Sequence, residues 1–260
     1  MSASPTLVVH RTVELLAEAA AARLLTHLVD VQSSGRVPSL VLTGGSIAGR
    51  VYSAVAASPA RGAVDWSRVE LWWGDERFLP AGDRERNETQ ARAVLLDSLR
   101  LDPGRVHPMP AADGEYAGEP EAAAAAYADL LRGASRPEDH ADVPTFDLLL
   151  LGVGPDGHVA SLFPEHPALY DERTVVAVHG APKPPPTRVT LSMPALVHAQ
   201  EVWFVVSGED KARAVRMALS GAGMMQVPAA AARGRQRTLW LLDRDAAAEV
   251  PPGLTRIASP

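Results

Sequence analysis

Short stretches of almost uninterrupted hydrophobic residues alternate along the chain with stretches whose hydrophobic residues recur at helical spacing. The hydrophobic stretches predict strands at 6–9, 40–42, 69–73, 146–151, 174–178, 188–191, 202–206 and 239–242. The helical spacing predicts helices at 13–31, 52–57, 87–99, 119–131 and 210–219. Apolar strands separated by helices are typical of a parallel sheet covered on both faces. The sequence therefore predicts an α/β fold with a mostly parallel sheet and helices on both faces.

Three polar or glycine-rich segments come directly after predicted strands. They are Thr43–Ser46, Gly74–Arg77 and Gly152–His158. In open α/β sheets, ligands bind outside the carboxyl ends of the strands. We therefore expect all three segments to lie at one edge of the sheet and to form a single site.

The first segment has the composition of an anion-binding turn. Gly44 and Gly45 let the backbone approach a ligand, and the start of the helix predicted after this segment offers free N–H groups to a phosphate. The glycine spacing fits neither a Walker loop nor a dinucleotide fingerprint. A plain tight turn is the alternative interpretation.

The second segment places two carboxylates and a guanidinium at the end of a strand. A salt-bridged surface turn is the common explanation of such a cluster, but the apolar Leu71–Trp73 stands immediately before Asp75 and Arg77. The charged groups therefore emerge directly from the core. An arginine in this place can hold a phosphate or an oxyanion with two hydrogen bonds.

The third segment follows the most apolar predicted strand and is the strongest local indication of catalysis. His158 can titrate near neutral pH, and Asp156 can either orient its ring or act as a base itself. A single histidine is more often structural, but this one stands on a glycine-rich turn at the ligand-binding edge. No His-x-His or Glu-x-x-His pattern completes a metal site.

The basic residues are almost all arginine. Of 25 lysines and arginines, only Lys183 and Lys211 are lysine, which indicates positions where a compact ammonium is needed, or else chance. Lys211 follows a predicted strand-to-helix turn, and Arg188 lies in a predicted strand, so both are candidates for binding an anion.

Composition narrows the class of protein. The net charge of −6 argues against a protein that coats nucleic acid, and 47% hydrophobic residues provide a substantial core. The chain has no cysteine, no recognisable signal peptide and no apolar stretch long enough to span a bilayer. We therefore expect one domain over residues 1–260, a cytoplasmic location, no membrane contact, and a monomer or weak homodimer.

The segments together resemble the 6-phosphogluconolactonase family over residues 38–219. The residues that carry the resemblance are Thr43–Ser46, Trp73–Arg77, Asn87, Leu151–Pro164, Lys183–Pro185, Arg188–Leu191 and Gly208–Lys211. The resemblance implies a modified Rossmann-like, doubly wound fold. It also implies hydrolysis of 6-phosphoglucono-δ-lactone to 6-phosphogluconate, in the oxidative pentose phosphate pathway, without a cofactor or metal.

The same resemblance assigns roles by position. It implies His158 as the general base with Asp156 beside it. The candidate groups for the substrate and its phosphate are Gly44, Gly45, Ser46, Asp75, Arg77, Arg188 and Lys211. The sequence departs from the family pattern at Ile47-Ala48 where threonine-proline is usual, at Arg86 where serine is usual, and at Glu165 where glycine is common.

Two other functions remain as alternatives. Glucosamine-6-phosphate deaminases of the same superfamily carry asparagine-glutamate-proline after the corresponding histidine, whereas this chain has Leu162-Phe163-Pro164. Phenylalanine cannot transfer a proton, so the lactonase is favoured. A non-catalytic sugar-phosphate sensor would need a DNA-binding module, and the segment before Pro38 is too short for one.

Overall fold

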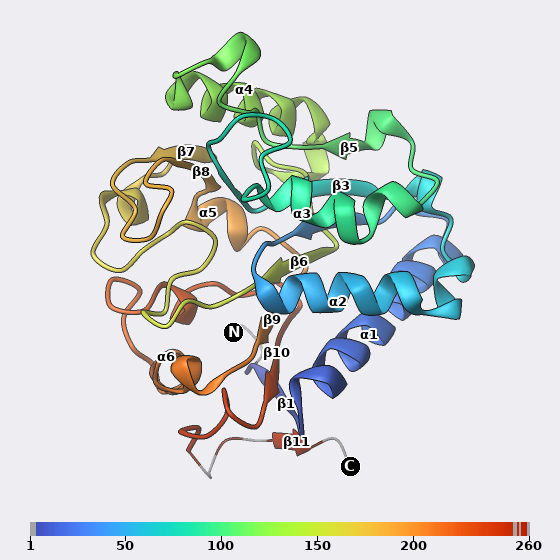
Figure 1. The fold of residues 1–260 in the computed structure, drawn as a ribbon, viewed down its shortest axis with the longest axis vertical. Helices are drawn as coiled ribbons and strands as arrows, with labels where there is room; N and C mark the ends of the chain where they lie inside the picture. The colour runs from blue at the N-terminus through green and yellow to red at the C-terminus, as the bar shows by residue number, and fades with distance from the viewer. Residues whose placement is uncertain (1–3, 252–253, 255, 259–260) are drawn as a thin grey trace.

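The computed structural model describes residues 4–251, 254 and 256–258. Its main sheet has eight strands in the order β11-β1-β10-β9-β6-β2-β3-β5, and every neighbouring pair is parallel (Figure 1). The strands are β1 (Thr6–His10), β2 (Ser39–Leu42), β3 (Glu70–Trp73), β5 (Val106–His107), β6 (Leu148–Leu151), β9 (Glu201–Val206), β10 (Arg237–Asp243) and β11 (Arg256–Ala258). The predicted α/β fold is confirmed.

The middle of this sheet is buried on both faces. All four leucines of β6 are at most 3% exposed, and its neighbours β2 and β9 are almost equally buried. Phe204 of β9 stacks on Trp240 of β10 with 3.9 Å between ring centroids. Such strands cannot carry unpaired polar side chains along their length, so polar chemistry is confined to their ends.

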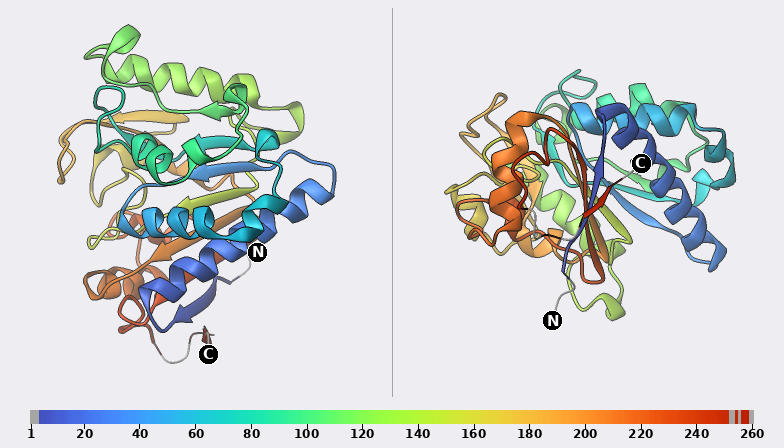
Figure 2. Two further views of the ribbon diagram at one scale, coloured as in Figure 1. Left: turned by 45° about the vertical axis from the view of Figure 1, so that its right-hand side comes forward. Right: turned by 90° about the horizontal axis from the view of Figure 1, so that it is seen from below.

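Helices cover the two faces of the sheet. Figure 2 shows α1 and α2 together on one face and α6 on the other. The helices are α1 (Val13–Ser33), α2 (Ser46–Ala57), α3 (Asn87–Val94), α4 (Pro120–Ala134), α5 (Met193–Leu196) and α6 (Ala212–Leu219). Thr12 caps α1 by accepting a hydrogen bond from the Leu15 N–H. Within the described residues, no helix is both long and apolar enough to cross a membrane.

A second, smaller sheet is a feature that the hydrophobic pattern does not reveal. It consists of β4 (Asp75–Arg77), β8 (Arg188–Leu191) and β7 (Val175–Val178), paired antiparallel in that order. The strands predicted at 174–178 and 188–191 therefore exist, but they do not join the parallel sheet. Hydrophobic spacing identifies a buried strand without identifying its partner, and β4 is too short and polar to be recognised.

Two predicted helix boundaries are wrong. The helix predicted at 52–57 begins at Ser46, because Gly45 adopts a φ of 98° and turns the chain directly into α2. The helix predicted at 87–99 ends at Val94 and continues only as a 3₁₀ turn at Leu96–Ser98. The first difference matters for function, because it places the start of α2 against the end of β2.

The central strand offers a test of the core. Leu149→Ala in β6 removes a side chain that is 0% exposed, so we expect a loss of about 2–5 kcal/mol in the free energy of unfolding. Leu130→Ala in α4 is the matched control, since Leu130 is 43% exposed, and should cost far less. Urea unfolding followed by circular dichroism measures both. Equal losses for the two variants would contradict this account of the core.

Candidate active site

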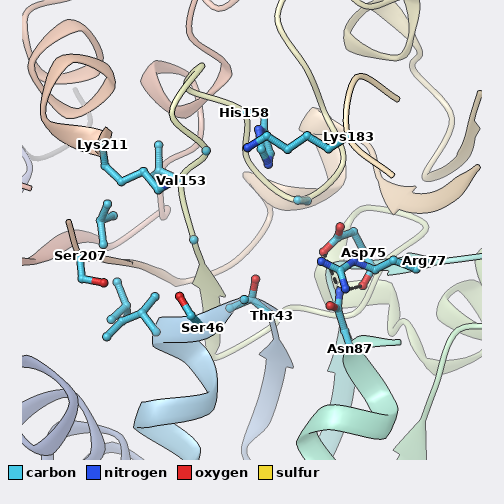
Figure 3. Close-up of a pocket in the computed structure, with 18 of the residues that line it drawn as sticks. Thr43, Ser46, Asp75, Arg77, Asn87, Val153, His158, Lys183, Ser207 and Lys211 are labelled. Carbon is cyan, nitrogen blue, oxygen red and sulfur yellow. Dashed lines mark hydrogen bonds between the residues drawn. The ribbon is translucent and has the colours of Figure 1, made fainter. Parts of the chain in front are cut away.

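A pocket of about 270 Å³ opens at the carboxyl ends of β2, β3, β6 and β9, which are neighbours in the sheet (Figure 3). It lies where the chain order reverses, between β2 and β6, as expected for an α/β fold. Eight of the predicted site residues line it: Gly44, Gly45, Ser46, Asp75, Arg77, His158, Arg188 and Lys211. Asp156 does not line the pocket but contacts His158. The three segments predicted to share one edge do so.

The side chain of Tyr52 holds the loop after β2 in place. The hydroxyl of Tyr52, one turn and a half into α2, donates to the Thr43 carbonyl at 2.8 Å and accepts from the Thr43 N–H at 3.1 Å. Gly45 precedes α2 and provides no side-chain cap, so the N–H groups of the first helical turn point toward the pocket side without a capping side chain. With Ser46 beside them, these groups offer several hydrogen-bond donors at the pocket wall, as suits an anion.

Asp75 is fixed by two side chains from other elements. Its Oδ2 accepts a hydrogen bond from the buried Ser161 hydroxyl at 2.6 Å. Asn87 at the start of α3 donates from Nδ2 to the Asp75 carbonyl at 2.9 Å and to Asp75 Oδ1 at 3.3 Å. The carboxylate is therefore held in one orientation at the pocket wall, where it can accept hydrogen bonds from substrate hydroxyls.

Glu76 points away from the pocket, and its buried side chain caps the N-terminus of α3. Its carboxylate accepts hydrogen bonds from the N–H groups of Asn87 at 2.6 Å, Glu88 at 2.9 Å and Arg77 at 2.8 Å. Burial raises the pKa of Glu76 to about 7, against the opposing effect of the Arg86 guanidinium 3.8 Å away and these N–H groups. Glu76 thus supports Asn87 and Arg77 without touching the pocket.

Arg86 is a fully buried arginine at a position where the sequence departs from the family pattern. It donates to the carbonyls of Leu79 at 3.1 Å and Met109 at 2.8 Å, and its guanidinium is 3.3 Å from Glu88 Oε2. The guanidinium satisfies loop carbonyls and partly offsets the charge of Glu76. The departure therefore has a structural role beneath the site.

His158 and Asp156 form a direct pair on the loop after β6. The Nδ1 atom of His158 lies 2.5 Å from Asp156 Oδ1, and the histidine side chain is 17% exposed. Burial alone would raise the pKa of Asp156, but the hydrogen bond and charge of His158 outweigh it and lower this pKa to about 2. Gly154 lies against both groups, and a Cβ at this position would overlap them. The loop is thus built around a carboxylate–imidazole pair.

The remaining cations come from distant parts of the chain. Lys211 precedes α6 and pairs with Asp210 at 2.6 Å, while Lys183 lies on the loop before β8. Figure 3 shows Lys211 and Ser207 on the side of the pocket near Ser46, with Lys183 on the side of His158. Ser207 was not among the predicted residues, because a serine after a strand carries no distinctive signal.

Comparison with known proteins places this architecture in a family. A family described as glucosamine-6-phosphate isomerases/6-phosphogluconolactonase matches residues 11–240. The chain is 64% identical over 260 residues to a 6-phosphogluconolactonase of Streptomyces coelicolor, covering 100% of both chains. It is 46% identical over 239 residues to one of Mycobacterium tuberculosis, covering 92% of this chain and 95% of the relative.

Solved structures agree with the sequence relatives. A 6-phosphogluconolactonase of Trypanosoma brucei superposes with a TM-score of 0.83 at 27% identity, covering 96% of this chain and 100% of that one. A monomeric glucosamine-6-phosphate deaminase has a TM-score of 0.76 at 19% identity, covering 94% of this chain and 100% of that one, and so shares the fold. The fold and the site are those of an α/β enzyme that acts on a sugar phosphate. The chain belongs to the glucosamine-6-phosphate isomerase/6-phosphogluconolactonase family, as the sequence resemblance predicted.

The buried carboxyl of Glu76 predicts a pH-dependent stability. Its pKa of about 7 lies above the ordinary 4.5, so the folded state holds an extra proton between these values. The free energy of unfolding should therefore fall as pH rises from 4.5 to 7, by up to about 3 kcal/mol from this group. Glu76→Gln should flatten that slope, as measured by urea unfolding at several pH values.

Glu18→Gln is the control for this experiment, because Glu18 is exposed in the second turn of α1. It should leave the pH dependence of stability unchanged. A Glu76→Gln variant whose stability keeps the wild-type slope would contradict the raised pKa.

Proposed function

We propose that this protein hydrolyses 6-phosphoglucono-δ-lactone to 6-phosphogluconate, with His158 as the general base that activates water. The observation that carries the proposal is the His158–Asp156 pair at the edge of a pocket lined by cationic groups. The named activity of the relatives at 64% and 46% identity supports the same substrate.

The protonation of this pair favours His158 over Asp156 as the base. Asp156 is ionised because its pKa is about 2, so its carboxylate has no proton to donate. The short contact to His158 therefore requires the proton on Nδ1, so the lone pair that a neutral imidazole carries lies on Nε2. No described residue hydrogen bonds to Nε2, so it is available to a water molecule in the pocket.

The reaction then follows from ester chemistry. Nε2 of His158 accepts a proton as water attacks the lactone carbonyl, and negative charge develops on the carbonyl oxygen. The tetrahedral intermediate collapses by breaking the bond between the carbonyl carbon and the ring oxygen. The imidazolium returns its proton to that ring oxygen, and the product is an open-chain acid. The Asp156 carboxylate stabilises the imidazolium during these steps.

The phosphate of the substrate supplies binding energy remote from the reacting carbonyl. The candidates for its site are Gly44, Gly45 and Ser46 at the start of α2, with Lys211 nearby. An uncapped helix start and an ammonium are suited to a phosphate dianion. Asp75 and Arg77 on the opposite wall are then the candidates for binding the sugar hydroxyls and the carbonyl end.

Phe163 argues against the deaminase branch as the second candidate. Its ring centroid lies 4.5 Å from that of His158, and the side chain is 1% exposed. This is the place in the sequence where the deaminase pattern has a glutamate. An apolar ring there cannot assist the ring opening of an amino sugar, whereas a lactone needs no second proton-transfer group at that point.

Replacing the proposed base tests the function directly. His158→Ala should lower kcat for lactone hydrolysis by about 10²–10⁴-fold, since general base catalysis contributes that much. The lactone is generated in situ, and 6-phosphogluconate formation is followed above the spontaneous rate. His140→Ala, on an exposed turn outside the pocket, is the control. Full activity of His158→Ala would transfer the base role to Asp156, and an inactive, folded wild type would refute the proposal.

Gly154 offers a second test, through geometry rather than chemistry. Gly154→Ala places a methyl group on the imidazole and on Asp156, so it should misorient the base and lower kcat at least about tenfold. Gly152→Ala on the same loop is the matched control. Its Cβ would meet only the Gly44 carbonyl at an ordinary 3.9 Å. Equal activity of the two variants would contradict a fixed His158 orientation.

A further inference from the structure

Lys183 is a cation of the pocket whose ammonium has no partner among the described residues. It lies on the loop 181–186, lines the pocket, and extends toward His158 (Figure 3). Among the described residues, no hydrogen bond or ion pair holds its ammonium, whereas Lys211 is paired with Asp210 at 2.6 Å. An unpaired ammonium beside the proposed base is available to stabilise negative charge that develops only during the reaction.

Arg188 fixes the backbone of this loop. Its Nε donates to the Pro185 carbonyl at 3.2 Å, and its Nη2 donates to the carbonyls of Lys183 at 3.0 Å and Pro184 at 3.1 Å. Three consecutive carbonyls of the loop are thus bound by one guanidinium. The side chain is also buried, at 5% exposure, and its guanidinium carbon lies 5.7 Å from the Phe163 ring centroid.

These hydrogen bonds distinguish the role of Arg188 from that of Lys183, which the sequence alone could not do. Arg188 lines the pocket wall, yet its Nε and Nη2 hydrogen bonds are directed into the loop. Burial lowers the pKa of Arg188, because a site with little water disfavours the charged guanidinium. A planar, multidentate donor is the group suited to several carbonyls at once, and lysine cannot replace it in that role.

We propose that Lys183 stabilises the oxyanion that develops on the lactone carbonyl, and that Arg188 is the positioning residue that holds Lys183 in place. This inference rests on the proposed lactone hydrolysis. His158 marks the reacting end of the pocket, and Lys183 is the lysine on that side. Lys211 lies on the side of the α2 start, where the phosphate is placed. The two lysines of the chain thus serve opposite ends of one substrate.

The absence of cysteine from the sequence allows a specific test. Lys183→Cys should lower kcat about 100-fold with little change in KM, as expected for the loss of an oxyanion donor. Alkylation of the new thiol with 2-bromoethylamine restores an ammonium of nearly the same length and should recover kcat to within about tenfold of wild type. Alkylation with iodoacetamide adds no charge and should recover nothing.

Arg188→Met supplies the second half of the test. It should lower kcat by a similar factor, and the double variant Arg188→Met/Lys183→Cys should be no slower than Lys183→Cys alone, because Arg188 acts through Lys183. Bromoethylamine should then fail to rescue the double variant. Arg173→Met removes an exposed arginine paired with Asp171 and is the control. Thermal unfolding of each variant verifies that it is folded.

The outcomes separate this inference from the proposed function. A folded wild type without lactonase activity would refute the function itself. An active wild type with unchanged kcat in Lys183→Cys would overturn the role of Lys183 alone. Additive losses in the double variant would show that Arg188 touches the substrate directly. If Arg188→Met does not fold, charge-specific rescue of Lys183→Cys still decides the role of the ammonium.

Discussion

The burial of the four central parallel strands is the constraint on which the rest of this molecule depends. Strands β9, β6, β2 and β3 are covered on both faces, so their side chains must be apolar nearly throughout. Polar groups from four separate stretches of sequence can emerge only where these strands end. Because the strands are parallel, their ends coincide, and one edge of the sheet collects the proposed base, the cationic side chains and the glycine-rich start of α2.

A buried polar layer beneath the pocket then gives these groups fixed orientations. Tyr52 holds the loop after β2, Glu76 caps α3, and Ser161 with Asn87 holds the Asp75 carboxylate. Each of these bonds joins one element to another, and the bond from Ser161 to Asp75 joins residues 86 positions apart. The pocket is therefore preorganised, so substrate binding need not supply the free energy to arrange it.

The fold and the main site segments could be predicted from sequence because their signals are local. A run such as Leu148–Leu151 is recognisable alone, and a glycine-rich turn after it marks the edge of the sheet. The antiparallel sheet could not be predicted, since the pairing of Arg77 with Arg188 joins residues 111 positions apart. For the same reason the sequence placed Arg188 with the ligand-binding cations, without revealing the carbonyls of Lys183–Pro185 that it binds.

Phe163 connects two parts of the site, since its ring lies 4.5 Å from the ring of His158 and 5.7 Å from the Arg188 guanidinium. A glutamate at this position would bring a carboxylate next to that guanidinium and compete with the loop carbonyls for its hydrogen bonds. This one substitution would therefore disturb loop 181–186 without creating a deaminase site. The side chain at 163 and the conformation of loop 181–186 are therefore coupled through the Arg188 guanidinium, and neither can change without affecting the other.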